Sequence, residues 1–94
     1  MDLNSRPAPH PQVAARVVDG SAVIVLADGG EVNVLNPVGT RIWELCDGSR
    51  SVRQIAESIA SEFDVTAERA LQDTEEFLGQ LLQSNAVELK NAAG

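Results

Sequence analysis

The side chains that could carry out chemistry in this chain are few, and they lie far apart in the sequence. There is one cysteine, Cys46, and one histidine, His10. A nucleophilic cysteine usually needs a base beside it, and a metal site needs several ligands. His10 lies in a proline-rich stretch, and Cys46 falls on the apolar face of a predicted helix, where cysteine is typically a core residue. We therefore expect no catalytic residue, no metal site and no bound cofactor.

The serine and glycine residues give no stronger signal. Ser49 and Ser51 are candidates for the phosphopantetheine attachment site of an acyl or peptidyl carrier protein, but the expected Asp-Ser-Leu motif is absent. Gly29 and Gly30 follow a predicted strand, yet no GxGxxG or P-loop pattern accompanies them, so phosphate binding is not indicated. The sequence predicts that this protein is not an enzyme.

Composition narrows the choice of partners. The chain has 94 residues, of which 44% are hydrophobic and 22% charged, and its net charge is −7. These values are typical of one folded domain. A negative charge argues against nucleic acid as a partner, since binding to phosphates depends on Lys and Arg. The longest apolar run, residues 22–27, is far shorter than the ~20 residues that a bilayer needs. With no signal peptide and one cysteine, we expect no membrane partner and a cytoplasmic location.

The first part of the chain predicts β-structure. Residues 1–12 contain alternating prolines and predict a disordered tail. Residues 13–18 and 21–26 predict two strands around Asp19-Gly20, a strong hairpin signal. Asp28-Gly29-Gly30 predicts a second turn, and residues 31–35 predict a third strand with alternating side chains. The second strand is apolar throughout and should be central, whereas the third should be an edge.

The second part predicts three helices. Asn36, Ser51 and Thr66 are typical N-caps, and each precedes an apolar stripe with helical spacing. Gly48 and Asn85 are typical of helix ends. Residues 86–89 predict a short terminal strand, and the residues after 89 should fray. The order βββααα, with two helices joined by a short turn, predicts an α+β fold resembling a winged helix-turn-helix.

A helix-turn-helix geometry raises the alternative of a DNA-binding regulator. The third helix would then be the recognition helix, but its acidic residues outnumber Arg69, its one basic residue, and a major groove would repel it. Those acidic residues are Glu68, Asp73, Glu75 and Glu76.

A surface for another polypeptide is the remaining interpretation. An edge strand has unpaired backbone groups, to which an extended peptide can add as a further strand. The third helix supports this interpretation because its apolar arc is wider than one packing face requires. On a helical wheel, Phe77 lies at one margin of that arc and Leu82 at the other. The margin of that arc is expected to line a groove beside the edge strand. The exposed edge also leaves open a homodimer that forms through the sheet.

The run LNPVGTRIWELCDG, residues 35–48, resembles the PqqD family. The later residues Ser51, Val52 and Ile55, the turn around Phe63 and Asp64, and the closing apolar helix are similar to the family's pattern as well. The resemblance covers about residues 13–89, with residues 1–12 as a tail and residues 90–94 as a frayed end.

The resemblance implies a non-catalytic chaperone, or recognition element, for ribosomally made and post-translationally modified peptides. Such a domain binds the leader of a precursor peptide by strand addition and presents it to a modifying enzyme, often a radical-SAM protein, as in pyrroloquinoline quinone biosynthesis. Carried onto this chain, the peptide-binding positions lie on the third strand and the third helix. They are Val32, Asn33, Val34, Leu35, Leu71, Thr74, Glu75 and Leu78.

Overall fold

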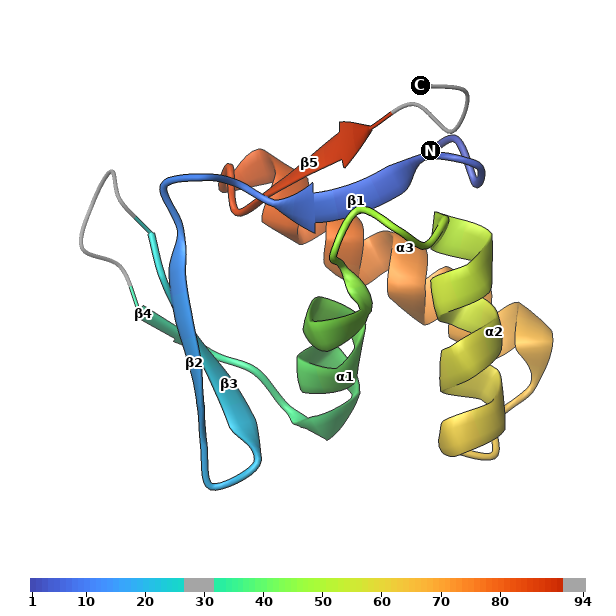
Figure 1. Ribbon diagram of the computed structural model, residues 1–94. Coiled ribbons are helices and arrows are strands. Elements are labelled where there is room, and N and C mark those ends of the chain that lie inside the picture. Colours follow the sequence, from blue (N-terminus) through green and yellow to red (C-terminus); the bar gives the residue numbers. More distant parts are fainter. Residues whose placement is uncertain (27–31, 91–94) are drawn as a thin grey trace.

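The computed structural model describes residues 1–26 and 32–90. They form a three-stranded sheet, a layer of helices on one side of it and a two-stranded ribbon (Figure 1). The antiparallel sheet has the order β2-β3-β4, from Ala14–Val18, Ser21–Val25 and Val32–Val34. The helices are α1 (Pro37–Leu45), α2 (Val52–Glu62) and α3 (Ala67–Gln83). The ribbon pairs β1 (Arg6–Pro9) with β5 (Val87–Lys90). The expected α+β class, with three antiparallel strands followed by three helices, is confirmed.

The hairpin between β2 and β3 forms at the predicted turn. Asp19 and Gly20 both have positive φ, 52° and 81°, as a type I′ turn requires. The pairing of Val18 with Ser21 then fixes the register of the whole hairpin. The strand β3 lies in the centre and β4 at the edge, as predicted. The predicted turn at Asp28-Gly29-Gly30 lies outside the described residues, as do residues 91–94 of the predicted frayed end. Lys90, the first residue of that predicted end, is instead paired with Arg6 in the ribbon.

Side-chain caps fix the starts of the three helices. Asn36 Oδ1 accepts a hydrogen bond from the Gly39 N–H at 2.7 Å, and Thr66 Oγ1 accepts one from the Arg69 N–H at 3.1 Å. Ser51 and Gln54 form a complete capping box. These caps satisfy N–H groups that have no partner within the helix, and each helix begins directly after its predicted N-cap.

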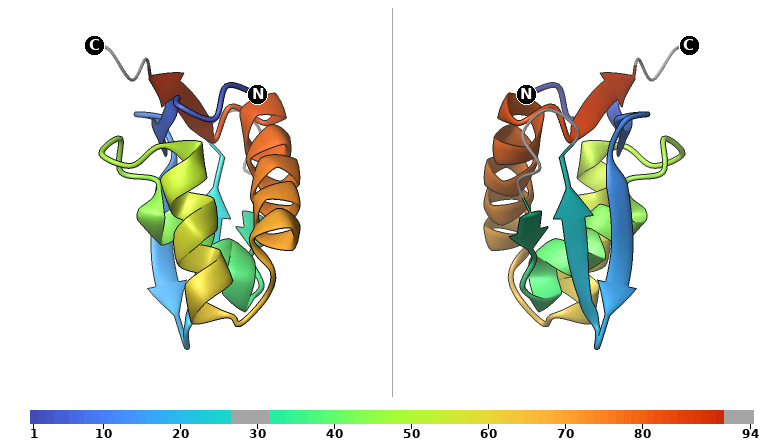
Figure 2. Two further views of the ribbon diagram at one scale, coloured as in Figure 1. Left: turned by 90° about the vertical axis from the view of Figure 1, so that its right-hand side faces the viewer. Right: turned by 90° about the vertical axis from the view of Figure 1, so that its left-hand side faces the viewer.

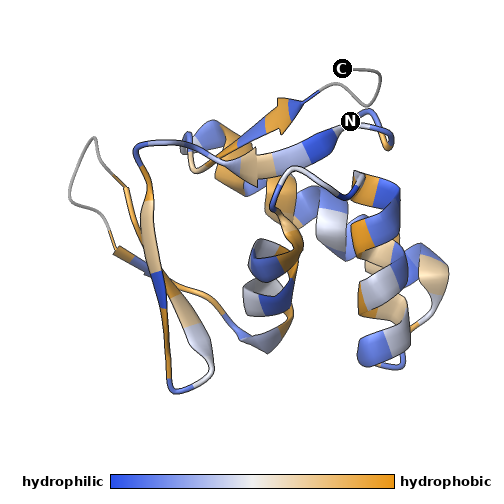
Figure 3. Ribbon diagram, viewed as in Figure 1, coloured by the Kyte–Doolittle hydropathy of each residue, from blue (hydrophilic) through white to orange (hydrophobic). Residues whose placement is uncertain are grey.

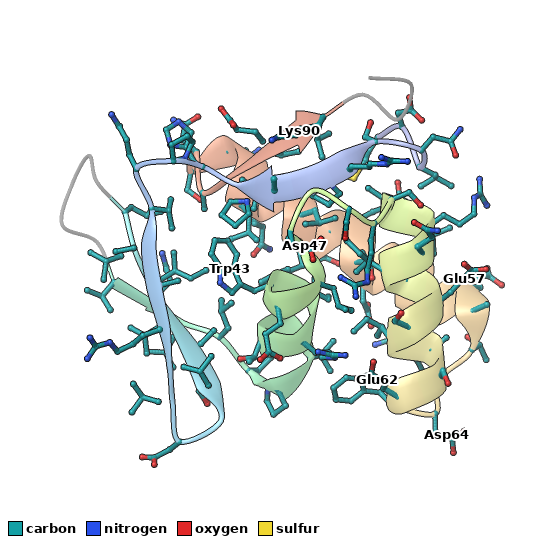
Figure 4. All side chains as sticks on the ribbon, in the orientation of Figure 1. Trp43, Asp47, Glu57, Glu62, Asp64 and Lys90 are labelled. Atoms are coloured by element: carbon teal, nitrogen blue, oxygen red, sulfur yellow. The ribbon has the colours of Figure 1, made fainter. Side chains whose placement is uncertain are left out.

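The core lies between the sheet and the helices. The inner face of β3 contributes Ala22 and Ile24, both fully buried. Trp43 on α1 is 9% exposed and lies between the sheet and α1 (Figure 4). Apolar positions follow the strands and the inner faces of the helices (Figure 3).

The N-terminal segment differs from the prediction of a disordered tail. Arg6–Pro9 pairs antiparallel with β5, and both Pro7 and Ala8 are buried. The Ser5 carbonyl accepts a hydrogen bond from the Val52 N–H at 2.9 Å, and the Leu3 carbonyl accepts one from the Arg53 N–H at 3.1 Å. The segment is ordered because it caps α2 and covers the core.

The prolines of β1 are compatible with the ribbon because of their spacing. The His10 N–H donates to the Ala86 carbonyl at 2.9 Å. Alternation then places the missing N–H groups of Pro7 and Pro9 on the edge that faces away from β5, so that no ladder bond is lost.

Within residues 1–26 and 32–90, no helix is long and apolar enough to cross a membrane. The same residues include no group of three or more His, Cys, Asp or Glu side chains that could hold a metal ion.

Candidate functional site

On the edge strand β4, two residues have backbone N–H and C=O groups that point away from the rest of the sheet. The Leu35 N–H donates to the Ala22 carbonyl at 2.9 Å, so the backbone of Leu35 points toward β3. In an antiparallel ladder the direction alternates along the strand. Asn33, opposite Ile24, therefore also points toward β3, whereas the N–H and C=O groups of Val32 and Val34 point toward the free edge. Within the described ranges no strand pairs with that edge.

A groove adjoins the carboxyl end of β4. It has a volume of about 330 Å³ and runs between the start of α1 and one side of α3. In the right-hand view of Figure 2, α3 lies on the same side of β3 as the edge strand β4. The lining residues come from the β4–α1 connection, from α1 and from α3. They are Asn36, Val38, Ile42, Asp73, Glu76, Phe77 and Gln80.

The groove depends on a close approach of α1 to α3 at Gly39. A Cβ placed on Gly39 would lie 3.0 Å from the Phe77 ring and 3.1 Å from Asn36 Oδ1. The absence of a side chain at Gly39 therefore lets the half-buried Phe77 ring pack directly on the first turn of α1. Phe77 supplies a broad apolar surface to the groove.

The wall on α3 is acidic. Asp73 and Glu76 line the groove, and only Asp73 has a paired charge, since its carboxylate accepts from Arg69 Nε at 3.2 Å. That ion pair is on the surface and links residues one helical turn apart, so it contributes little to stability. The groove thus combines an apolar ring with carboxylates, and it begins at Asn36, just after the edge strand.

The structure separates the site residues predicted from sequence into two groups. Val32, Asn33 and Val34 lie on the edge strand, and Leu35 follows them, half-buried. Thr74 and Leu78 are each 0% exposed, so the expectation that they contact a peptide is wrong, because they belong to the core. The structure thus brings the four predicted positions from Val32 to Leu35 together at one edge of the sheet. It does not bring Thr74 and Leu78 to that edge.

The remaining two predicted helix positions do not line the groove either. Leu71 lies in a separate hollow with Arg53, Ala56 and Glu57 of α2. Glu75 is half-buried and absent from the groove lining. None of the helix residues predicted from the sequence lines the groove, whereas Phe77, at the opposite margin of the same apolar arc, does.

The other candidate groups have structural roles. The Cys46 thiol is 1% exposed and donates to the Ile42 carbonyl, and burial raises its pKa to about 12. Ser49 Oγ donates to Asp47 Oδ1, which is the main reason that the pKa of Asp47 lies below its usual value. Ser51 Oγ caps α2. These interactions account for all three side chains as parts of the fold.

Comparison with known proteins points to one family. The sequence model described as coenzyme PQQ synthesis protein D (PqqD) matches residues 21–87. No curated protein matches the chain.

Solved structures share the fold. TbiB1 in complex with the TbiA(beta) leader peptide is 25% identical, with a TM-score of 0.79, and the match covers 86% of this chain and 94% of that one. A lasso peptide synthetase B1 complexed with a leader peptide is 19% identical, with a TM-score of 0.79 and coverage of 88% and 98%. The solution structure of the PqqD part of Methylobacterium extorquens PqqCD, described as a stand-alone recognition element for ribosomally synthesized and post-translationally modified peptides, is 21% identical, with a TM-score of 0.70 and coverage of 87% of each chain.

Proposed function

The chain belongs to the PqqD family, and we propose that it binds the leader of a ribosomally made precursor peptide and presents it to a modifying enzyme, without catalysing a reaction itself. One observation carries the proposal: the N–H and C=O groups of Val32 and Val34 point toward a free sheet edge, and the groove between α1 and α3 begins at Asn36, directly after that strand and Leu35. The structural neighbours that were solved with leader peptides support it.

The leader adds to β4 as a fourth strand. Its main chain pairs with Val32 and Val34, and alternate side chains point toward the groove. An apolar or aromatic side chain packs on Phe77, and a Lys or Arg side chain meets Asp73 and Glu76. The ligand is therefore an extended segment with alternating apolar residues and at least one basic residue.

The finer description of the fold and its setting belongs to the same proposal. The helices α2 and α3, with the β2–β3 hairpin as wing, correspond to a winged helix-turn-helix that binds peptide in place of DNA. Residues 13–89 contain the peptide-binding elements, the modifying enzyme is a radical-SAM protein, and the complex operates in the cytoplasm.

Peptide selection followed by NMR tests the proposal. Binders are selected from a displayed library of random peptides, and the best one is synthesised and titrated into the ¹⁵N-labelled full chain. We expect the amide signals of Val32, Val34 and the Phe77 side of α3 to shift, with a dissociation constant in the micromolar range or below. Shifts confined to α2, or a library that yields no binder, would sink the strand-addition mechanism.

A further inference from the structure

The outer face of the three-stranded sheet is apolar and uncovered. The register places eight side chains on this face, and the helices pack on the opposite one (Figure 2). Among the described residues, no element lies over it. The outer-face residues are Ala14, Arg16, Val18, Ser21, Val23, Val25, Val32 and Val34.

The valine side chains on this face are unusually exposed for an apolar residue. Val25 is 38% exposed, Val32 56% and Val34 69%. Val18, at 48%, adds to them on the same face. Contiguous exposed apolar side chains of this kind often mark an interaction surface.

The charge of the outer face differs from that of the chain. The chain has a net charge of −7, yet none of the strand positions on this face is acidic, and its one charged residue is Arg16. Arg16 lies on the β2 edge strand, where its long side chain can reach solvent around a covering partner. Two acidic molecules can therefore approach each other here without opposing their carboxylates.

The shape of the face is self-complementary. Val32 and Val34 form a ridge on β4. Beside it, over β2 and β3, lies a shallow hollow of about 230 Å³, lined by Ala14, Ala15, Arg16, Val23 and Val25. A two-fold axis places the ridge of each copy into the hollow of the other, as an isologous interface requires.

We propose that the outer face is a self-association surface, through which two copies of this chain pack sheet against sheet. The face consists of three short strands, so we expect an interface smaller than the ~800 Å² that each partner buries in a standard complex, and a weak dimer with a dissociation constant of about 0.1–1 mM. The backbone groups of Val32 and Val34 point along the sheet plane and not toward the second copy, so peptide binding at β4 remains compatible with the dimer. The inference does not depend on the proposed function.

Sedimentation equilibrium of the peptide-free chain, from about 10 µM to about 1 mM, tests the proposal over the range where such a dimer forms. The weight-average mass of the wild type is expected to rise from 10.0 kDa toward twice that value. Val25→Glu and Val18→Glu place a charge on the outer face and should keep the chain monomeric throughout.

Val17→Glu is the matched control. Val17 is as exposed as Val18, 51% against 48%, but its side chain lies on the opposite face beside Trp43. This variant should dimerise like the wild type, and circular dichroism checks that each variant folds. A wild type that stays at 10.0 kDa, or a Val17→Glu variant that loses association as completely as Val18→Glu, would overturn the proposal.

Discussion

At the scale of single residues, the direction of one backbone group separates neighbouring positions of β4. Asn33 points its N–H and C=O groups toward β3, and Val34 points its own toward the free edge. The backbone groups of Asn33 therefore bond to β3 within the sheet. Those of Val34, the next residue, are available to a partner strand. Substitutions that remove the N–H group distinguish these two roles.

Proline at Val34 should block peptide addition while preserving the fold. Val34→Pro removes only an outward donor, and its ring obstructs an incoming strand, so the affinity for a selected peptide should fall at least tenfold, since about one hydrogen bond is lost. Asn33→Pro instead breaks the ladder with Ile24 and should lower the free energy of unfolding by about 1–3 kcal/mol, because the Ile24 carbonyl loses its donor. Fluorescence anisotropy and urea unfolding measure the two effects. Equal peptide binding by Val34→Pro and the wild type contradicts strand addition.

Thr74 offers a test of the corrected site. Its Oγ1 atom is buried and has no hydrogen-bond partner among the described residues. Thr74→Val removes that unsatisfied hydroxyl with little change of shape, so the protein should become more stable by about 1 kcal/mol, which urea unfolding measures. Peptide affinity should not change, because Thr74 lies in the core. A loss of affinity would return Thr74 to the binding surface.

Cys46 should be chemically silent in the folded chain. Burial raises the pKa of its thiol from 9.0 to about 12, with a smaller contribution from Asp47. Ellman's reagent at about pH 8 should leave the native thiol unmodified and react with it in denaturant. Because the folded-state pKa is the higher one, this contribution to stability is complete below pH 9.0 and is lost as the pH rises toward 12. Rapid native labelling would show that the core opens at α1.

At the scale of elements, local signals defined the boundaries but not the packing. Asn36, Ser51 and Thr66 each bond to a backbone group three residues away, so the sequence alone locates the helix starts. Which margin of α3 remains open depends on where α1 and α2 pack against it, and periodicity contains no information about that. Phe77 lines the groove because α1 approaches it at Gly39 and not at Leu71.

The N-terminal strand illustrates a second limit. Prolines two residues apart usually indicate an extended or disordered segment. The pattern is equally compatible with a strand in which every proline nitrogen lies on the same edge. In this structure, that edge is the one that faces away from β5. The partner strand lies about eighty residues later in the chain, from Val87 to Lys90, and only long-range pairing reveals it.

Disrupting β1 should therefore destabilise the whole domain. Ala8 is 6% exposed, and Ala8→Asp would bury an unpaired carboxylate, lowering the free energy of unfolding by about 3 kcal/mol. Ala15→Asp makes the same change on the exposed strand β2 and should cost less than about 1 kcal/mol. Urea unfolding of both variants checks the comparison. Equal stability of the two would mean that β1 is not a structural element in solution.

At the scale of the whole molecule, the net charge of −7 opposes compaction. Only four ion pairs link charged side chains in the described part of the chain, and all four are on the surface. Screening should therefore stabilise the fold, and we expect the melting temperature to rise by a few °C between about 10 mM and about 300 mM KCl. A falling melting temperature would indicate that the surface ion pairs dominate.

The same charge predicts that duplex DNA does not bind. The helix α3, which would occupy a major groove, has Glu68 in its first turn and Asp73 and Glu76 along one side. A gel shift at low salt, where phosphate contacts are strongest, should show no complex. A retarded band would support a DNA-binding regulator.

The position of Trp43 makes the domain convenient for optical work. The chain has one tryptophan and no tyrosine, so its near-ultraviolet emission comes essentially from a single indole ring. That ring extends from α1 toward the sheet. It lines a hollow together with Pro9 and Val17, and it does not line the groove on α3. Its spectrum should shift to the red when the core is hydrated and should scarcely respond to an occupant of the groove. Intrinsic fluorescence thus reports global unfolding alone, and a dye on the ligand reports binding in the same cuvette.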